Sequence, residues 1–411
     1  MTITGVSILL LVVWYVTYRY LRSKLSTCKI YFVLLGLMAL PGLFIPDLPL
    51  MGLYPRFFNF WYIVLFAVLM VLVLIPWIKF DKYLNNIPNF TIKPQYIDSL
   101  KWVFVLTIVL SLYSIVYAYP YASNSITQGA LEVRHSLSEE SPLPPNIFTT
   151  MAVGFASFSP VAILLAYISM LDKRLQKYTI LLIISSSSYI VITLAICARD
   201  GFIYTSLTYV VLFFVFKRSL SQKSIAKIKR ITTIIAPIVF TLFLSFSLAR
   251  FYVTGNDSKE LLYGTWGYLY QQPYVFDHVL DSFHDFYGFE RRLSFLKDVI
   301  PLAGHEYTAS NIIEYMFGTQ FAEFYEISGL SSLIILSFLY ILLFYIVIAT
   351  HIRRNLIFPV LLSFLIYFYF TISGIFYFRF GGNNSEFLFF VAILLSSFFV
   401  PNILTINNNE K

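Results

Sequence analysis

The sequence predicts an all-α fold: a polytopic transmembrane helix bundle of about eleven spans, with one large, partly helical periplasmic loop. Three observations lead to this prediction. Of 411 residues, 58% are hydrophobic and only 12% are charged, whereas soluble domains carry about a quarter charged residues. The hydrophobic residues come in blocks of about 20, the length that crosses a bilayer. Lysines and arginines are distributed unequally between the segments that join these blocks.

The spans are placed by these hydrophobic blocks. In chain order they are expected at 3–18, 29–46, 57–78, 102–120, 148–170, 179–198, 201–216, 231–249, 328–350, 356–377 and 386–403. The first block has neither a basic segment before it nor a small-residue cleavage site, so it is expected to be an uncleaved span. Three parts result: about eight spans in 1–249 with a periplasmic segment at 121–147, a large periplasmic loop at 250–327, and about three spans in 328–411.

The basic residues predict the orientation. If the N-terminus lies outside, 20 of the 29 lysines and arginines fall on the cytoplasmic side, as the positive-inside rule requires. The C-terminus is then cytoplasmic. The formal net charge of +8 is thereby explained by topology, and no nucleic-acid partner is needed. The basic segment 217–230 is interpreted as an anchor of this kind, with anionic-lipid binding as the alternative.

Several chemistries lack their motifs. The chain contains no phosphate-binding P-loop, no HExxH or CxxC metal motif and no GxSxG nucleophile elbow. Cys28 and Cys197 fall near opposite membrane faces, so no disulfide is expected. We therefore expect a function that requires no cofactor, neither nucleotide nor metal.

Arginines on the outer side are the first candidates for a site, because topology alone predicts few positive charges there. Arginine also presents a planar fork that binds phosphate through two hydrogen bonds. The candidates are Arg199, Arg250, Arg291, Arg292 and Arg379. Simpler interpretations stay open: an ion pair of Arg199 with Asp200, interfacial placement of Arg250, an ordinary polar turn around Arg379, and solvent exposure of one residue of the Arg291–Arg292 pair.

Histidines and acids of the large loop are the second candidates. His305 and Glu306 lie in a glycine-flanked segment where a general base would act. His278, Asp281 and Asp285 share one helical face. A metal site is conceivable there, but the favoured interpretation is the solvent-exposed face of an amphipathic helix whose apolar face carries Phe276 and Leu280.

Three features of the chain belong together. The first is Ala198-Arg199-Asp200-Gly201 at a short outer turn, and the second is Ser247-Leu248-Ala249-Arg250 before one large, late outer loop. The third is the end of that loop, Phe321-Ala322-Glu323-Phe324-Tyr325 followed by Gly329. Together they resemble the O-antigen polymerase family, the repeat-unit polymerases of bacterial surface polysaccharides. The segment Glu326-Ile327-Ser328-Gly329 departs from the Asp-Phe-Gly style ending expected of the family.

The resemblance implies a glycosyltransferase of the bacterial inner membrane that acts at the periplasmic face. A growing glycan leaves its polyprenyl (undecaprenyl) pyrophosphate carrier and joins the next lipid-linked repeat unit. Arg199, Arg250, His305 and Glu306 are the expected catalytic residues, with Arg291, Arg292, Glu323, Tyr325 and Arg379 in substrate binding. His305, Glu306 and Glu323 all remain open as the general base. Membrane lipid is an expected partner, and a chain-length regulator is left open.

Two other functions fit the same topology. An O-antigen ligase, which moves a finished chain to lipid A-core, resembles a polymerase closely at this level. A lipid-linked oligosaccharide flippase is a transporter, and transporters carry internal repeats and charges within spans. Neither feature stands out in this sequence.

Overall fold

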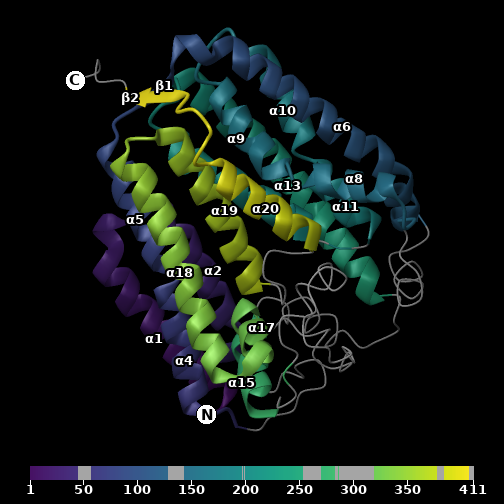
Figure 1. Ribbon diagram of the computed structural model, residues 1–411. Coiled ribbons are helices and arrows are strands. Elements are labelled where there is room, and N and C mark those ends of the chain that lie inside the picture. The colour runs from purple at the N-terminus through teal and green to yellow at the C-terminus, as the bar shows by residue number, and fades with distance from the viewer. Residues whose placement is uncertain are drawn as a thin grey trace, which may run out of the picture. The chain divides into compact units, whose positions relative to one another are not determined.

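The computed structural model describes residues 1–44, 57–127, 143–196, 198, 200–252, 270–282, 286, 319–376 and 384–406. The chain is mostly helical, with a single short pair of strands in the part described (Figure 1). It divides into two compact units, and each is discontinuous in sequence. Unit 1 consists of Met1–Asn85, Leu262–Asn355 and Ser363–Leu394, and unit 2 consists of the remaining segments.

Six helical segments are long and apolar enough to cross a membrane: Ile3–Leu21, Phe60–Asn86, Pro94–Ser125, Gln176–Ala195, Leu330–Arg353 and Ile357–Ile375. A seventh is the bent pair Ile147–Ala156 and Ser159–Ser169. The expected spans at 29–46 and 201–216 correspond to shorter apolar helices, Cys28–Phe44 and Asp200–Phe216. A membrane-spanning helical protein is therefore supported, whereas the expected count of about eleven spans is not confirmed.

Unit 1 is built from helices at both ends of the chain. Its elements are α1 (Ile3–Leu21), η1 (Arg22–Lys24), α2 (Cys28–Ala39), α3 (Pro41–Phe44), α4 (Phe60–Leu72), α5 (Leu74–Asn86), α15 (Gln272–Ser282), α17 (Thr319–Ser328), α18 (Leu330–Arg353), the part of α19 (Ile357–Phe376) from Ser363 onwards, and most of α20 (Asn384–Ser396). Two of them, α15 and α17, are short helices within the expected loop 250–327.

Aromatic packing joins α5 to α19 inside unit 1. The Trp77 ring lies edge-on to Phe364 at 5.7 Å, and the Phe80 ring stacks on Phe364 at 3.6 Å between centroids. Tyr367 donates a hydrogen bond to the carbonyl of Val73. Lipid tails are as apolar as the helices, so close packing and polar contacts of this kind decide which helices pair.

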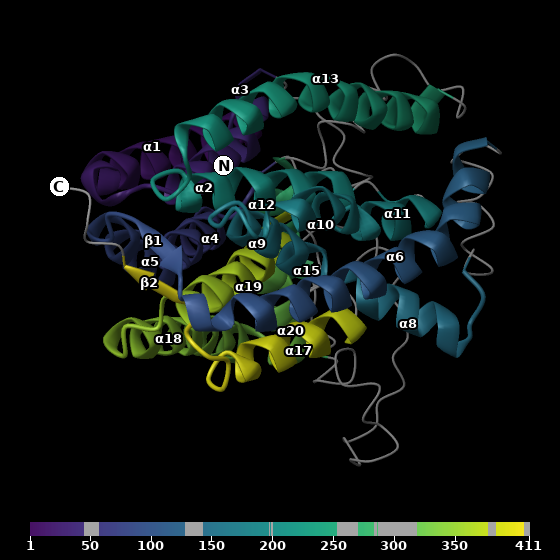
Figure 2. The same cartoon turned by 90° about the horizontal axis from the view of Figure 1, so that it is seen from above.

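Unit 2 is helical apart from one short pair of strands among its described residues. Its elements are β1 (Phe90–Ile92), η2 (Pro94–Tyr96), α6 (Ile97–Thr127), α8 (Ile147–Ala156), α9 (Ser159–Ser169), η3 (Gln176–Tyr178), α10 (Thr179–Ser185), α11 (Ser188–Ala195), α12 (Asp200–Phe216), α13 (Gln222–Tyr252) and β2 (Leu404–Ile406). Small buried residues, among them Ala118, Ala152 and Ala195, lie where α6, α8 and α11 meet (Figures 1 and 2). Small side chains let helices approach closely in a membrane.

One expected span of unit 2 is bent at a serine. The span at 148–170 bends by 42° between α8 and α9, where Ser157 Oγ donates to the Val153 carbonyl at 3.2 Å. A hydroxyl that bonds a carbonyl of its own helix competes with the helical pattern and often bends the helix. The span at 179–198 stays one helical segment, with a turn between α10 and α11 where Ser186 Oγ donates to the Ile183 carbonyl at 2.6 Å.

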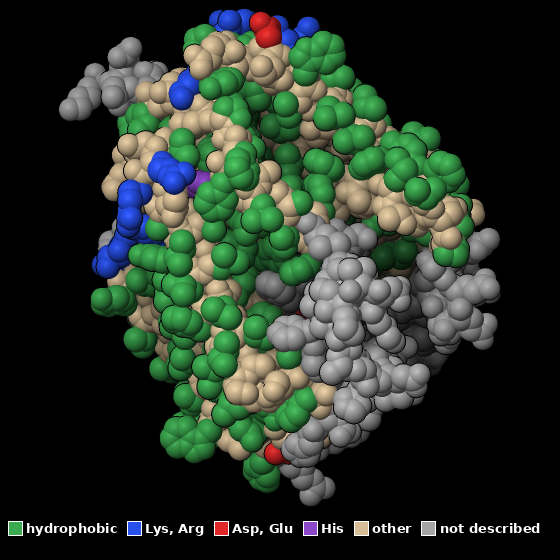
Figure 3. All heavy atoms as spheres, in the orientation of Figure 1, with side chains coloured by type: hydrophobic (Ala, Val, Ile, Leu, Met, Phe, Trp, Pro, Cys, Tyr) green, Lys and Arg blue, Asp and Glu red, His purple; other side chains and the backbone are tan. Residues whose placement is uncertain are grey.

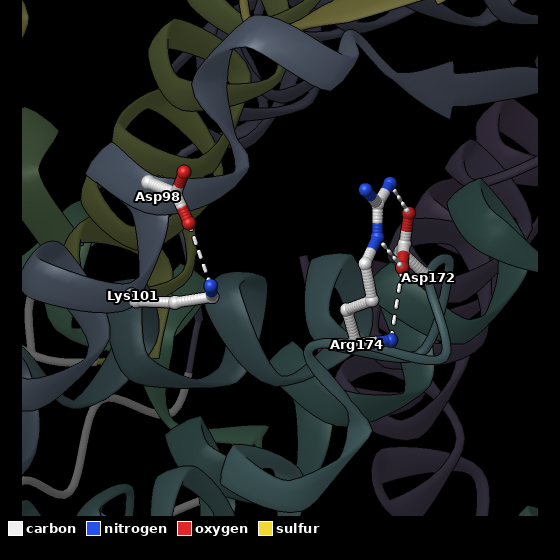
Figure 4. A network of polar contacts seen from close by, with 4 residues as sticks. All are labelled: Asp98, Lys101, Asp172 and Arg174. Carbon is white, nitrogen blue, oxygen red and sulfur yellow. Dashed lines mark hydrogen bonds and ion pairs between the residues drawn. The ribbon is translucent and has the colours of Figure 1, made fainter.

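Two polar features stand at one side of unit 2. Strands β1 and β2 pair antiparallel, with Thr91 opposite Thr405. Figure 4 shows two local ion pairs, Lys101–Asp98 at 2.6 Å and Arg174–Asp172 at 2.7 Å. Because both pairs join near neighbours in sequence at an exposed surface, each contributes about 0–1 kcal/mol to stability.

Candidate active site

The two ends of unit 1 carry opposite charges. The lysines and arginines that the structure describes in unit 1 gather at one end. They lie in the last turns of α1, in η1, at the start of α2, in α5, and at or just after the end of α18. They are Arg19, Arg22, Lys24, Lys29, Lys79, Lys82, Arg353 and Arg354. We call this the basic end. Four of the described carboxylates lie on α15 and α17 instead, which form the acidic end. In Figure 3 blue side chains lie over the region of α5 and the end of α18.

The acidic end is assembled around α15. Its Tyr274 hydroxyl lies 3.4 Å from the Ile3 carbonyl at the start of α1, and its ring contacts Phe58 at 4.8 Å between centroids. One turn further, Asp277 accepts a hydrogen bond of 2.9 Å from the backbone N–H of Asn59, just before α4. The first turns of α1 and α4 therefore meet α15 at one level of the unit.

Asp277 is a buried carboxylate of this group. Its side chain is 5% exposed, and among described residues the Asn59 N–H is the only donor that it has. Burial raises the pKa of Asp277 to about 6; the Asn59 hydrogen bond opposes the rise and the Asp281 carboxylate adds to it. A carboxylate with a pKa near the working pH is suited to accept and return protons.

The expected amphipathic helix is found only in part. Phe276 and Leu280 are buried and Asp281 is exposed, but polar Gln272 is buried too and His278 is half-buried, so most of α15 lies inside the unit. Burial lowers the pKa of His278, whose ring lies 3.0 Å from the Ser282 hydroxyl. Among the described residues no three His, Cys, Asp or Glu side chains lie together as metal ligands would. Asp285, the third member of the conceivable metal face, lies outside the described residues.

Helix α17 forms a tight hairpin with α18. Gly329 joins them with a φ of 75°, a backbone conformation that glycine adopts without steric cost. The Ser332 hydroxyl donates to the Phe324 carbonyl at 2.7 Å, and the Ser328 N–H donates to Ser332 Oγ at 3.0 Å. These contacts fold α17 back along the first turns of α18.

Two of the sequence-predicted site residues lie on α17. Glu323 is 5% exposed. The Tyr325 hydroxyl donates to the Leu280 carbonyl at the end of α15 at 3.3 Å, and burial raises its pKa. The structure thus brings the helix of Glu323 and Tyr325 against the helix of Asp277. Their assignment to substrate binding stays a prediction.

The other predicted site residues are not brought to this end by the described structure. Arg199, Arg291, Arg292, His305, Glu306 and Arg379 lie outside the described residues. Arg250 belongs to α13, and its side chain is outside the description. Next to Arg199, the Asp200 carboxylate accepts a hydrogen bond of 3.1 Å from the Tyr189 hydroxyl. Asp200 therefore has a partner in α11.

Sequence reasoning missed Asp277. The helical face His278, Asp281 and Asp285 drew attention because its spacing is regular, yet Asp281 faces solvent. The local sequence offers no signal that separates Asp277 from Asp281, because the two are four residues apart and share a helical face. Only the packing around the first turns of α15 buries Asp277, and a buried carboxylate is a better site candidate than an exposed one because it is costly unless it is hydrogen-bonded.

Comparisons with known proteins identify no relative: no family model, no curated protein and no solved structure matches this chain. The acidic end offers a buried proton acceptor, a second buried carboxylate in Glu323 and several aromatic rings. Rings with polar tips suit the faces of sugars, and carboxylates accept hydrogen bonds from hydroxyl groups.

Proposed function

We propose that the protein is a glycosyltransferase-type polymerase that joins polyprenyl-pyrophosphate-linked oligosaccharide repeat units into O-antigen or another surface polysaccharide. It would lie in the bacterial inner membrane with about eleven spans. Its N-terminus, the acidic end and the segment 250–327 would be periplasmic, and its C-terminus cytoplasmic. The opposite charges of the two ends of unit 1 support this orientation, since basic residues favour the cytoplasmic side.

The buried carboxylate of Asp277 carries the proposal. With a pKa of about 6, Asp277 is deprotonated at neutral pH and accepts the proton of the acceptor hydroxyl. The hydroxyl oxygen then bonds to the anomeric carbon of the growing glycan. The bond between that carbon and the pyrophosphate oxygen breaks, and the carrier leaves with the electron pair. Asp277 thereby joins His305, Glu306 and Glu323 as a candidate general base.

The leaving group explains why no nucleotide is needed, because the lipid pyrophosphate is already activated. Negative charge develops on its phosphate oxygens as it departs. Fixed arginines stabilise such charge more in the transition state than in the ground state. Arg199 and Arg250 are proposed for this role, with Arg291, Arg292 and Arg379 in substrate binding. This role rests on the resemblance of the sequence motifs.

A transporter is the second candidate, because one observation favours it. The bent span α8–α9 meets the junction of α10 and α11 where Ser159 Oγ donates to the Ser186 carbonyl at 2.6 Å. Interrupted helices are typical of the substrate sites of transporters. A lipid-linked oligosaccharide flippase would use such a site, whereas nothing in the fold favours a ligase over a polymerase.

Glycan sizing in a deletion strain tests these functions. A surface glycan of single repeat units indicates a polymerase. Lipid-linked polymer without surface glycan indicates a ligase, and repeat units that stay on the cytoplasmic side indicate a flippase. We expect the first result.

Two matched variants then test the base. Complementation with Asp277→Asn should slow transfer by 10²-fold or more and leave mostly single repeats. Asp281→Asn removes an exposed carboxylate one turn away on the same helix. It should restore the full ladder, that is, the wild-type range of glycan chain lengths. A full ladder from Asp277→Asn, at matched protein levels, would remove Asp277 from the chemistry.

A further inference from the structure

The N-terminal turn of α17 lies inside unit 1. Two contacts between the antiparallel helices α18 and α19 show which of their residues lie side by side. The Tyr340 hydroxyl lies 2.8 Å from Thr371 Oγ1, and the Phe344 and Tyr367 rings are 4.9 Å apart. By this register, Gly374 of α19 lies level with residues near Ser337 of α18. Ser337 is about 10 Å along α18 from its first residue, at 1.5 Å per residue.

Gln320 lies at that same depth. A Cβ atom built on Gly374 would fall 2.1 Å from Gln320 Oε1, so the amide packs directly on the α19 backbone. The α17–α18 hairpin places Gln320 at the same depth. The hydrogen bond from Ser332 to the Phe324 carbonyl fixes Phe324 beside the start of α18, and Gln320 lies one turn further inward. Helix α17 therefore runs from the interior of unit 1 outward to Gly329.

The amide of Gln320 is unusual in two respects. Its side chain is 0% exposed, and within the described part of the chain neither Oε1 nor Nε2 has a hydrogen-bond partner. Buried polar groups are nearly always paired, and an unpaired one costs about 1–3 kcal/mol. Beside it Thr319 has a φ of 70°, a strained conformation for a β-branched residue.

A second amide of the same kind precedes α15, which packs on α17. Gln271 is 1% exposed, and its Nε2 has no hydrogen-bond partner in the described residues. Two buried amides on neighbouring elements thus have unused donors, and Gln320 has an unused acceptor as well, among the described residues. A site at Gln320 recognises a ligand that offers both a donor and an acceptor.

The charges of α17 narrow the class of ligand. Glu323 and Glu326 are both buried on the helix that Gln320 begins. Their carboxylates would repel a phosphate at this position, although a helix N-terminus by itself attracts anions. A neutral hydroxyl is compatible with both acids, because a carboxylate accepts its hydrogen bond.

We propose that Gln320 binds hydroxyl groups of the glycan repeat unit at the inner end of α17. This deepens, and rests on, the proposed polymerase function by naming a sugar-binding subsite distinct from the phosphate-binding arginines. A site built to bond a hydroxyl discriminates strongly against ligands that lack it. Gln320 is thus assigned a role in choosing which sugar is accepted.

Direct binding tests the subsite without requiring polymerisation. The purified full-length protein in detergent is titrated with repeat-unit oligosaccharide released from the surface polysaccharide of the source cells, while binding and thermal unfolding are measured. Gln320→Met keeps the length of the side chain and removes its polar atoms. We expect its unfolding temperature to stay equal or to rise, while oligosaccharide binding weakens at least tenfold. Gly374→Ala, which displaces the Gln320 amide, should also weaken binding.

Gly36→Ala is the matched control, because a Cβ there meets nothing within 4 Å. It should bind as the wild type does. Wild-type binding by Gln320→Met would overturn the inference, and so would a loss of its stability, which would indicate a structural hydrogen bond. If the wild type binds the oligosaccharide and Gln320→Met does not, the subsite stands even where glycan sizing rejects the polymerase. If the wild type binds no oligosaccharide, the proposed subsite is wrong even where glycan sizing confirms the polymerase.

Discussion

The two ends of unit 1 each bury an aspartate, but the two carboxylates are held very differently. Asp81 at the basic end is 0% exposed and accepts hydrogen bonds from five donors: the N–H groups of Ser26, Thr27 and Cys28 and the hydroxyls of Ser26 and Thr27. Asp277 at the acidic end accepts one from Asn59 in the described structure. Donors that replace lost water make the first carboxylate a structural anchor, while their scarcity leaves the second available for proton transfer.

The anchor role of Asp81 follows from where its donors lie. Ser26, Thr27 and Cys28 are at the start of α2, whose first N–H groups have no partner within the helix. Trp77 adds a hydrogen bond of 2.6 Å from its ring nitrogen to Thr27 Oγ1. A carboxylate of α5 thus caps α2 and fixes how these two helices pack.

The largest expected effect is the loss of this anchor. Asp81→Ala leaves several buried N–H and hydroxyl donors without an acceptor, and each costs about 1–3 kcal/mol. We expect a total loss of at least about 4 kcal/mol, observed as poor accumulation or a sharply lower unfolding temperature in detergent. Lys82→Ala, at the exposed neighbouring position, should have little effect. A stable Asp81→Ala protein would show that Asp81 is not a structural anchor.

The pH dependence of stability is the next largest effect, and it belongs to Asp277. Its pKa is raised from 3.8 to about 6, so between about pH 4 and pH 6 the folded state binds more protons than the unfolded state. The contribution of Asp277 is then fully present below about pH 4 and is lost as pH rises through about 6. The shift corresponds to about 3 kcal/mol.

Asp277→Asn is neutral throughout that range and still offers an oxygen to the Asn59 N–H. Unfolding temperatures measured from pH 4 to pH 8 should therefore fall for the wild type relative to Asp277→Asn, with most of the change below pH 7. Parallel curves for the two proteins would show that the carboxylate is not held in a poorly solvated site.

The smallest effects concern two glycines six residues apart. A Cβ on Gly42, at the acidic end, would lie 2.3 Å from Ser7 Oγ and 2.7 Å from the Tyr274 hydroxyl, and overpacking of this kind costs about 1–3 kcal/mol. A Cβ on Gly36, within α2, meets nothing within 4 Å, and alanine is favoured over glycine in a helix by about 1 kcal/mol. Gly42→Ala should therefore lower the unfolding temperature and Gly36→Ala should raise it slightly; equal shifts would mean that α15 is not packed against α3.

The sequence by itself determined the class of this protein. Lipid offers no partner for backbone N–H and C=O groups, so long apolar blocks must become helices, and the separation of basic from acidic residues along the chain reappears as the two ends of unit 1. The sequence also predicted short helices within 250–327, where α15 and α17 lie. It did not predict the bend between α8 and α9, because the bend lies at a single serine hydroxyl that hydropathy does not register.

Only the tertiary structure separated the two aspartates and placed Gln320 deep in unit 1. The difference lies in the donors, which come from far along the chain: Thr27 is 54 residues from Asp81, and Asn59 is 218 residues from Asp277. A local sequence pattern records which side chain is present and on which helical face it falls. The solvation that sets its reactivity depends on groups that come together only when the helices pack, so a local sequence pattern cannot identify them.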